Sequence, residues 1–164
     1  MRLTRAGEYA VRCMLYLSSQ PVGAVVNRRE VAQAMDIPEP FLGKIGQQLA
    51  RAGLVELVQG ARGGLRMARS PEEVTLLDVV EAVNGPIFLN DCLMRRGFCQ
   101  RSPECAVHRI WDRARSGLRE TLRAATFAEL LKEEGVSGSR ATHPKRGKPS
   151  ARSDLRRTPR QKGG

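Results

Sequence analysis

Residues 27–67 decide the fold, and they read NRREVAQAMDIPEPFLGKIGQQLARAGLVELVQGARGGLRM. Asn27 and Glu30 form a capping-box pattern that starts a short helix. That helix ends before Pro38, because a proline disfavours a helical residue in front of it. A second helix follows, with apolar residues at helical spacing, and Gly53 closes it. Two short helices joined by a tight turn predict a helix-turn-helix motif.

The hydrophobic period changes from helical to strand-like directly after this motif. Val55 and Leu57 flank a polar residue, and so do Leu65 and Met67. Between these pairs, residues 60–64 read GARGG, a turn whose glycines favour positive φ. A helix-turn-helix followed by a β-hairpin is a winged helix. The sequence therefore predicts a mainly α fold with a small β-hairpin wing.

Helical patterns also flank the winged motif. Thr4 is the expected cap of a helix over residues 5–19, and Cys13 lies on its apolar face. Thr75 and Thr126 start two further helices, each with an acid three residues on. Between them, residues 104–124 form a long helix. We expect the following apolar residues of this helix on one side: Val107, Trp111, Ala114, Leu118 and Leu122.

Positive charge is concentrated at the C-terminal end. The chain has 164 residues and a net charge of +11, and residues 135–164 contain nine Lys or Arg against one Asp. This tail has almost no apolar residues, so we expect it to be disordered. Its charge predicts a nucleic acid as partner.

The rest of the composition narrows the class of protein. No apolar run approaches the roughly 18 residues that span a bilayer, and the N-terminus resembles no signal peptide. We therefore expect a cytoplasmic protein without a membrane partner. In that reducing compartment the four cysteines are better explained as ligands or redox groups than as disulfides. No nucleophile–base pair, paired carboxylates or cofactor loop is recognisable, so we expect no enzyme.

The second helix of a helix-turn-helix enters the major groove, and its solvent face reads base edges. Glutamine suits adenine there and lysine suits guanine, whereas arginines on a hairpin suit phosphates or the minor groove. Each residue by itself can equally be an ordinary solvated side chain. The candidate DNA-binding residues are Arg28, Arg29, Lys44, Gln47, Gln48, Arg51, Gln59, Arg62 and Arg66.

Three cysteines form the second candidate site. Cys92, Cys99 and Cys105 are spaced C-x6-C-x5-C, and His108 follows one helical turn later. Thiolates hold iron–sulfur clusters, and imidazole replaces one of them in some centres. Zinc accepts the same donors, but its structural sites have closer cysteine pairs. Three free thiols in a loop are the remaining alternative. Cys13, on the apolar face of its helix, is expected in the core.

These features together resemble the Rrf-type winged-helix repressors, which include IscR-like and NsrR-like iron–sulfur regulators. The resemblance covers residues 1 to about 133. Beside the three cysteines, the matching stretches are MRLT at 1–4, EYAV at 8–11, FLGKI at 41–45, AGLV at 52–55, GARGG at 60–64, TLLDVVEA at 75–82 and HRIW at 108–111.

The resemblance implies a homodimer that pairs through the long helix, binds a palindromic operator and carries a cluster near the dimer interface. IscR-like members use a histidine at the position of His108 as fourth ligand, whereas NsrR-like members use an acid at the position of Glu8, supplied by the partner subunit. We favour Glu8. The sequence as a whole predicts a winged-helix DNA-binding domain at 1–84, a cysteine loop at 85–103, a dimerisation helix and C-terminal helix at 104–134, and a disordered basic tail at 135–164.

Three departures from the family pattern matter, one of which is the basic tail, about which the resemblance says nothing. The first cysteine gap is one residue longer than expected, so the cluster type, 2Fe-2S or 4Fe-4S, stays open. Gln59 stands where many members have an arginine before the wing glycine. The function predicted from the sequence is a repressor whose operator binding is gated by a cluster that senses nitric oxide, redox state or iron–sulfur supply. The alternative is a cluster-free or zinc-bound DNA- or RNA-binding protein led by its basic tail.

Overall fold

A computed structural model describes residues 4–95 and 97–135. The predicted basic tail, apart from Gly135, and the first three residues of the MRLT motif lie outside the described residues. The elements are α1 (Arg5–Ser18), α2 (Arg28–Ala34), α3 (Glu39–Arg51), β1 (Val55–Val58), β2 (Gly64–Met67), α4 (Leu76–Asn84), α5 (Asp91–Met94), α6 (Ala106–Ala124) and α7 (Phe127–Glu133). The predicted fold class, mainly α with one β-hairpin wing, is confirmed.

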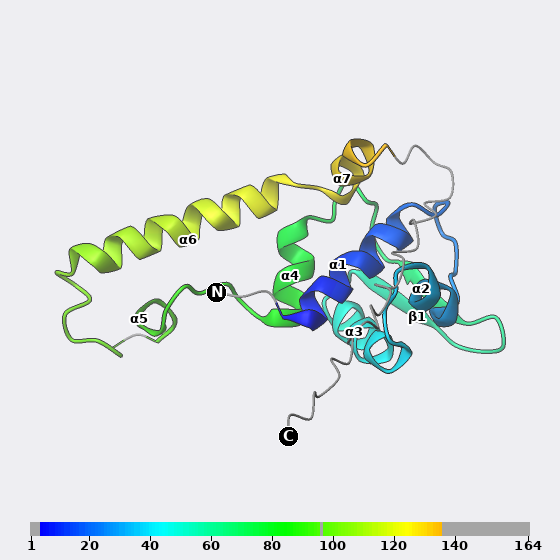
Figure 1. Cartoon of the computed structure of the whole chain (residues 1–164), viewed down its shortest axis with the longest axis horizontal. Helices are drawn as coiled ribbons and strands as arrows, with labels where there is room; N and C mark the ends of the chain where they lie inside the picture. The colour runs from blue at the N-terminus through cyan, green and yellow to red at the C-terminus, as the bar shows by residue number, and fades with distance from the viewer. Residues whose placement is uncertain (1–3, 96, 136–164) are drawn as a thin grey trace, which may run out of the picture.

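Helix α1 is the centre of a winged-helix body, by which we mean α1 to α4, the hairpin and α7 (Figure 1). Its apolar face is buried against α3, α4 and α7. Cys13 lies in this core, fully buried, as predicted. Burial raises the pKa of the Cys13 thiol to about 12, because the charged thiolate is poorly solvated there.

Side-chain caps fix where the helices of this body begin. Thr4 accepts a hydrogen bond from the Gly7 N–H at 3.1 Å. Thr75 and Thr126 both start helices with complete capping boxes, as predicted. In the second box, the backbone and hydroxyl of Thr126 donate to Glu129 and lower the pKa of that carboxyl.

The capping-box prediction for α2 is wrong in one partner. Asn27 caps the helix by accepting a hydrogen bond from the Arg29 N–H at 2.9 Å. The Glu30 carboxylate instead accepts a hydrogen bond from the Tyr16 hydroxyl at 2.8 Å. Glu30 therefore ties α2 to α1 rather than closing its own helix end.

The wing is a two-stranded antiparallel hairpin in which Leu57 pairs with Leu65. Gly60 has the positive φ expected in its turn, at 104°. Gly64 is needed for a different reason: a Cβ there would overlap the carbonyl oxygen of Val26. Val26 and Leu65 exchange two backbone hydrogen bonds of 2.8 Å, so the segment before α2 extends the hairpin, a pairing that the sequence pattern did not reveal.

Helix α6 extends away from the winged-helix body as an arm (Figure 1). Its C-terminal half packs on α4, where Leu118 and Leu122 cover a small second cluster of Leu77, Val80 and Ile87. The five residues predicted on one side keep the spacing of a single helix face, and this face extends beyond α4. Val107 and Trp111, in the part beyond α4, are 61% and 43% exposed. The helix also begins at Ala106, two residues later than predicted.

The segment between α4 and α6 is less irregular than predicted, because it contains the one-turn helix α5. Across the described ranges, no helix is long and apolar enough to cross a membrane.

Candidate functional site

The solvent-facing side of α3 is polar and follows from how the helix packs. Leu42, Ile45 and Leu49 enter the core. Gly46 faces the wing, where a Cβ would lie 3.1 Å from a methyl group of Leu65. The positions left to solvent form one stripe, which contains Lys44, Gln47 and Arg51, all exposed as predicted.

Gln48 is less exposed than these three residues. It is half-buried, and its Nε2 donates to the backbone oxygen of Val83 in α4 at 3.4 Å. Gln48 therefore lies at the edge of the stripe nearest α4, and its contact with DNA stays a prediction.

Two arginines stand where α2 and α3 meet. Arg28 lies against the backbone at Gly43, with a guanidinium nitrogen 3.8 Å from where a Cβ would be. Arg29 pairs with Glu39 at 3.5 Å, and both side chains are mostly exposed, at 79% and 59%. An ion pair so exposed contributes little and can be exchanged for a phosphate. Both arginines begin α2, as the sequence predicts, and they also lie beside α3.

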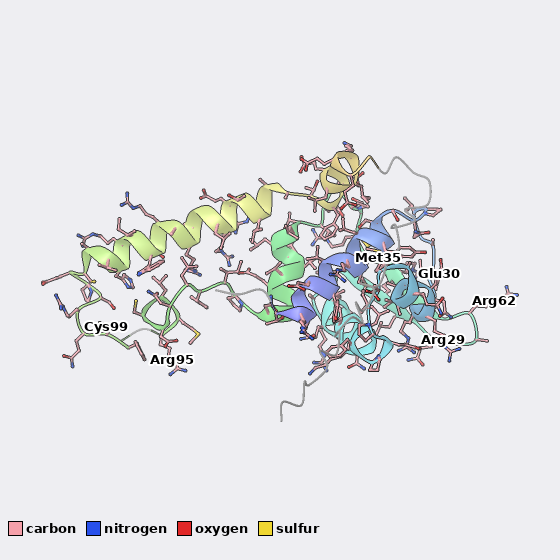
Figure 2. The ribbon with its side chains drawn as sticks, viewed as in Figure 1. Arg29, Glu30, Met35, Arg62, Arg95 and Cys99 are labelled. Carbon is pink, nitrogen blue, oxygen red and sulfur yellow. The ribbon has the colours of Figure 1, made fainter. Side chains whose placement is uncertain are left out.

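The wing presents Arg62 and Gln59 to solvent, whereas Arg66 is engaged. Arg66 lies opposite Glu56 in the hairpin register, and its guanidinium forms an ion pair with that carboxylate. Figure 2 places Arg62 at the tip of the wing and Arg29 at the same end of the molecule. The exposed face of α3, the start of α2 and the wing tip therefore offer cationic and amide groups that suit phosphates and base edges. We call these residues the DNA face: Arg28, Arg29, Lys44, Gln47, Arg51, Gln59 and Arg62.

The cysteines lie at the other end of the molecule, where Figure 2 labels Cys99. Cys92 is in α5, Cys99 is in the following loop, and Cys105 is the N-cap residue of α6. All three are half-buried and free. His108, in the first turn of α6, has its Nδ1 at 3.4 Å from the sulfur of Cys92. The thiol of Cys92 also donates a hydrogen bond to the side-chain oxygen of Asn90, with a sulfur–oxygen distance of 3.4 Å.

The donor set suits an iron–sulfur cluster chemically, since thiols and an imidazole are its usual protein ligands. The single chain does not assemble that set. Within the part of the chain that the structure describes, no three His, Cys, Asp or Glu side chains are close enough to hold a metal ion. Of the five predicted ligands, only Cys92 and His108 are in contact. Glu8 is exposed in the first turn of α1 and is not grouped with the thiols.

Residues 3–133 match the model of one protein family, Rrf2, described as iron-dependent transcriptional regulators. The chain belongs to the Rrf2 family. Among curated relatives, it is 36% identical over 134 residues to Protein aau3 of Rhizobium meliloti, covering 80% of this chain and 86% of that protein. It is 30% identical over 135 residues to the HTH-type transcriptional regulator NsrR of Shouchella clausii, covering 82% of this chain and 91% of that one.

Solved structures agree on the fold. The global cysteine regulator CymR of B. subtilis matches with a TM-score of 0.65 at 22% identity, over 81% of this chain and 98% of that one. IscR of T. potens matches with a TM-score of 0.61 at 24% identity, over 82% and 88%. The Rrf2 family consists of transcriptional regulators, so this chain is a DNA-binding transcriptional regulator rather than an enzyme, as predicted.

Sequence reasoning missed one group of side chains in this Rrf2 protein. Glu81 of α4 pairs with Arg119 of α6, and Arg115 of α6 donates to the backbone oxygen of Ile87. A helical pattern indicates which residues face one another only when the partner helix is known. The only signal in the sequence was two arginines four residues apart beside Leu118, on the side of α6 that packs on α4.

Proposed function

We propose that this Rrf2 protein is a homodimeric, cytoplasmic repressor that binds a palindromic operator and responds to an iron–sulfur cluster. The observation that carries the DNA-binding part is the polar stripe of α3 beside an exposed wing tip. In winged helices of this kind the recognition helix enters the major groove, and flanking arginines contact phosphates. Lys44, Gln47 and Arg51 are then the base-reading candidates.

The exposed apolar side of α6 supports a second copy of the chain as partner. Val107, Ile110 and Trp111 are 61%, 53% and 43% exposed, on a helix of 19 residues in which no residue is fully buried. Large apolar side chains gathered on one exposed face mark an interface. Pairing α6 with its copy covers them and presents two DNA faces to the two halves of a palindrome, since a two-fold dimer requires a two-fold site.

Cys92, Cys99 and Cys105 are the proposed thiolate ligands of the cluster. The contact between His108 and Cys92 supports His108 as the fourth ligand, because that imidazole already lies beside a thiol of its own chain. Glu8 of the partner subunit is the other candidate. The sequence favoured Glu8, whereas the contact between His108 and Cys92 favours His108. When bound, such a cluster supplies a redox-active centre that oxidants and small gases attack.

The chain's own residues suggest how ligand release reaches the dimer. Cys105 directly precedes α6, so a change at its side chain acts on the N-terminal end of that helix. Val107 and Trp111 of the proposed interface follow within two turns. Movement there alters how the two copies pair and hence the separation of their recognition helices.

The test is anaerobic purification with iron and sulfide analysis and Mössbauer spectroscopy. We expect iron and sulfide in the wild type, and their loss in Cys92→Ser. Cys13→Ala is the matched control, because Cys13 is buried in the winged-helix body and should leave the metal content unchanged. His108→Ala should alter the spectrum and Glu8→Ala should not. The reverse result assigns the ligand to Glu8, and two unaltered spectra exclude both residues.

A cluster-free or zinc-bound regulator is the second candidate. One observation favours the cluster-free form: in the described residues no three potential ligands lie together, so neither a cluster nor a zinc ion has a preformed site. A colourless anaerobic preparation that lacks iron and sulfide while binding its operator would establish this candidate, and zinc analysis would then separate its two forms.

A further inference from the structure

A polar clamp connects α4, the start of the cysteine loop and α6. We use this name for Glu81, Ile87, Arg115 and Arg119. One carboxylate oxygen of Glu81 accepts a hydrogen bond from the Ile87 N–H at 3.0 Å and also binds the guanidinium of Arg119. Arg115 donates from Nε to the Ile87 oxygen at 2.8 Å. Both sides of the Ile87 backbone are thereby held, one by α4 and the other by α6.

The clamp differs from the exposed ion pairs of the molecule in its burial. The side chains of Glu81 and Arg119 are 22% and 23% exposed, compared with the far more exposed Arg29 and Glu39. Partial desolvation strengthens hydrogen bonds between charged groups. Arg115 is held further by the ring of Phe88, with its guanidinium carbon 4.6 Å from the ring centre. The clamp is therefore better suited than the surface pairs to hold a fixed geometry.

A second attachment of α6 to α4 lies at the C-terminal end of the arm. The Leu76 N–H donates to the Ala125 oxygen at 2.9 Å, and the Phe127 N–H donates to the Val74 oxygen at 3.0 Å. Two attachment points define the direction of a rod. With the backbone bonds fixing one end, the clamp at Arg115 and Arg119 determines the angle at which the rest of α6 leaves the winged-helix body. The apolar cluster below it is non-directional and does not set an angle.

We infer that Glu81, Arg115 and Arg119 are positioning residues that set the half-site spacing this regulator accepts. The inference rests on the proposed pairing of α6 in a homodimer. Arg115, the clamp residue nearer the N-terminal end, lies nine residues from Ala106, so the part of α6 beyond the clamp is about 14 Å long at about 1.5 Å per residue. A change of about 15° at the clamp then moves its far end by about 3.5 Å, close to the rise of one base pair. The angle of the arm thus translates into operator spacing.

The experiment measures spacing preference rather than affinity alone. A palindromic operator is first selected from random DNA with the wild-type protein, and its half-sites are then moved together or apart by one and two base pairs. Full-length wild type, Arg119→Met and Glu81→Gln are titrated on each DNA by fluorescence anisotropy. Glu81→Gln keeps an acceptor for Ile87 while removing the charge that binds Arg119. Arg123→Met is the control, an exposed arginine of the same helix with the same loss of charge.

We expect the wild type and Arg123→Met to lose about tenfold in affinity when the spacing changes by one base pair, which corresponds to about 1.4 kcal/mol. In Arg119→Met and Glu81→Gln that ratio should fall to about threefold or less, with unchanged binding to a single half-site. Analytical ultracentrifugation and circular dichroism check that the variants remain dimeric and folded.

A spacing profile of both variants equal to that of the wild type overturns the inference while the proposed function stands. A wild type that is monomeric, or indifferent to spacing, overturns the proposed dimeric repressor together with the inference. If Arg119→Met fails to fold, the spacing profile of Glu81→Gln by itself tests the inference.

Discussion

The neighbouring glutamines of α3 are expected to respond to alanine substitution in opposite ways. Gln47 faces solvent in the middle of the polar stripe, whereas Gln48 donates to the Val83 oxygen of α4. Gln47→Ala should therefore weaken the cognate operator and leave the stability of the protein unchanged. Gln48→Ala should lower the stability and affect all DNA sequences evenly.

The magnitudes follow from the two environments. A side chain that reads a base contributes about 1–3 kcal/mol to discrimination, so Gln47→Ala should cost about 5- to 150-fold in affinity per half-site. The bond of Gln48 joins two neutral groups at 3.4 Å, which is long for an N–H···O bond. Its loss should lower the free energy of unfolding by about 0.5–1 kcal/mol, at the weak end of such bonds.

The assay combines two measurements on the same variants. Fluorescence anisotropy on the selected operator, and on operators with single base-pair substitutions, gives the specificity, while urea denaturation gives the stability. Gln100→Ala is the control, because Gln100 is exposed in the cysteine loop, far from the DNA face. If Gln47→Ala keeps wild-type specificity while Gln48→Ala relaxes it at one base pair, the assignment of the α3 stripe is refuted.

Three further predictions concern other parts of the chain. In metal-free native protein, iodoacetamide at pH 8 should alkylate the three loop cysteines and spare Cys13, because burial raises the pKa of the Cys13 thiol to about 12. Peptide mass spectrometry measures the labelling of each cysteine, and rapid labelling of Cys13 would contradict the prediction. Gly64→Ala should lower the free energy of unfolding by about 1–3 kcal/mol through overlap with the Val26 oxygen, whereas Gly117→Ala, at a helix position with open space, should raise it by about 0.5–1 kcal/mol in urea titrations. Truncation after Glu134 should flatten the salt dependence of operator binding and preserve sequence preference; loss of preference in anisotropy titrations would show that the tail reads sequence.

The winged helix could be predicted because its information is local. Apolar spacing, the glycines of the wing and the threonine caps each act over a few residues, and the structure places the elements where these signals predict them. The polar stripe of α3 also follows from local spacing, except where a contact with a distant element determines the direction of a side chain. Gln48 is such a case, since only the packing of α4 against α3 reveals that its amide has an intramolecular partner.

The arrangement around α6 could not be predicted for the same reason. Its apolar residues share one side of the helix, and the sequence pattern does not reveal that α4 covers only the C-terminal part of that side. Glu81 and Arg119 are 38 residues apart in the sequence, so no spacing rule relates them. The thiol spacing predicts a kind of ligand chemistry, which stays a prediction, and the geometry of a site shared between segments, or between subunits, is not encoded in that spacing.

Helix α4 is the element through which the two ends of the molecule can communicate. Figure 2 shows Cys99 and Arg62 at opposite ends, so a signal at the cysteines cannot reach the DNA face by direct contact within one chain. Gln48 of α3 is bonded to α4 at Val83, and the polar clamp is bonded to α4 at Glu81, two residues away. A helix of nine residues with a complete capping box at its start moves as one body. In the proposed mechanism, a displacement of α6 that shifts Glu81 also shifts the Val83 carbonyl group, which accepts the hydrogen bond from Gln48. Such coupling would require no long pathway, because both bonds lie within one turn of the same helix.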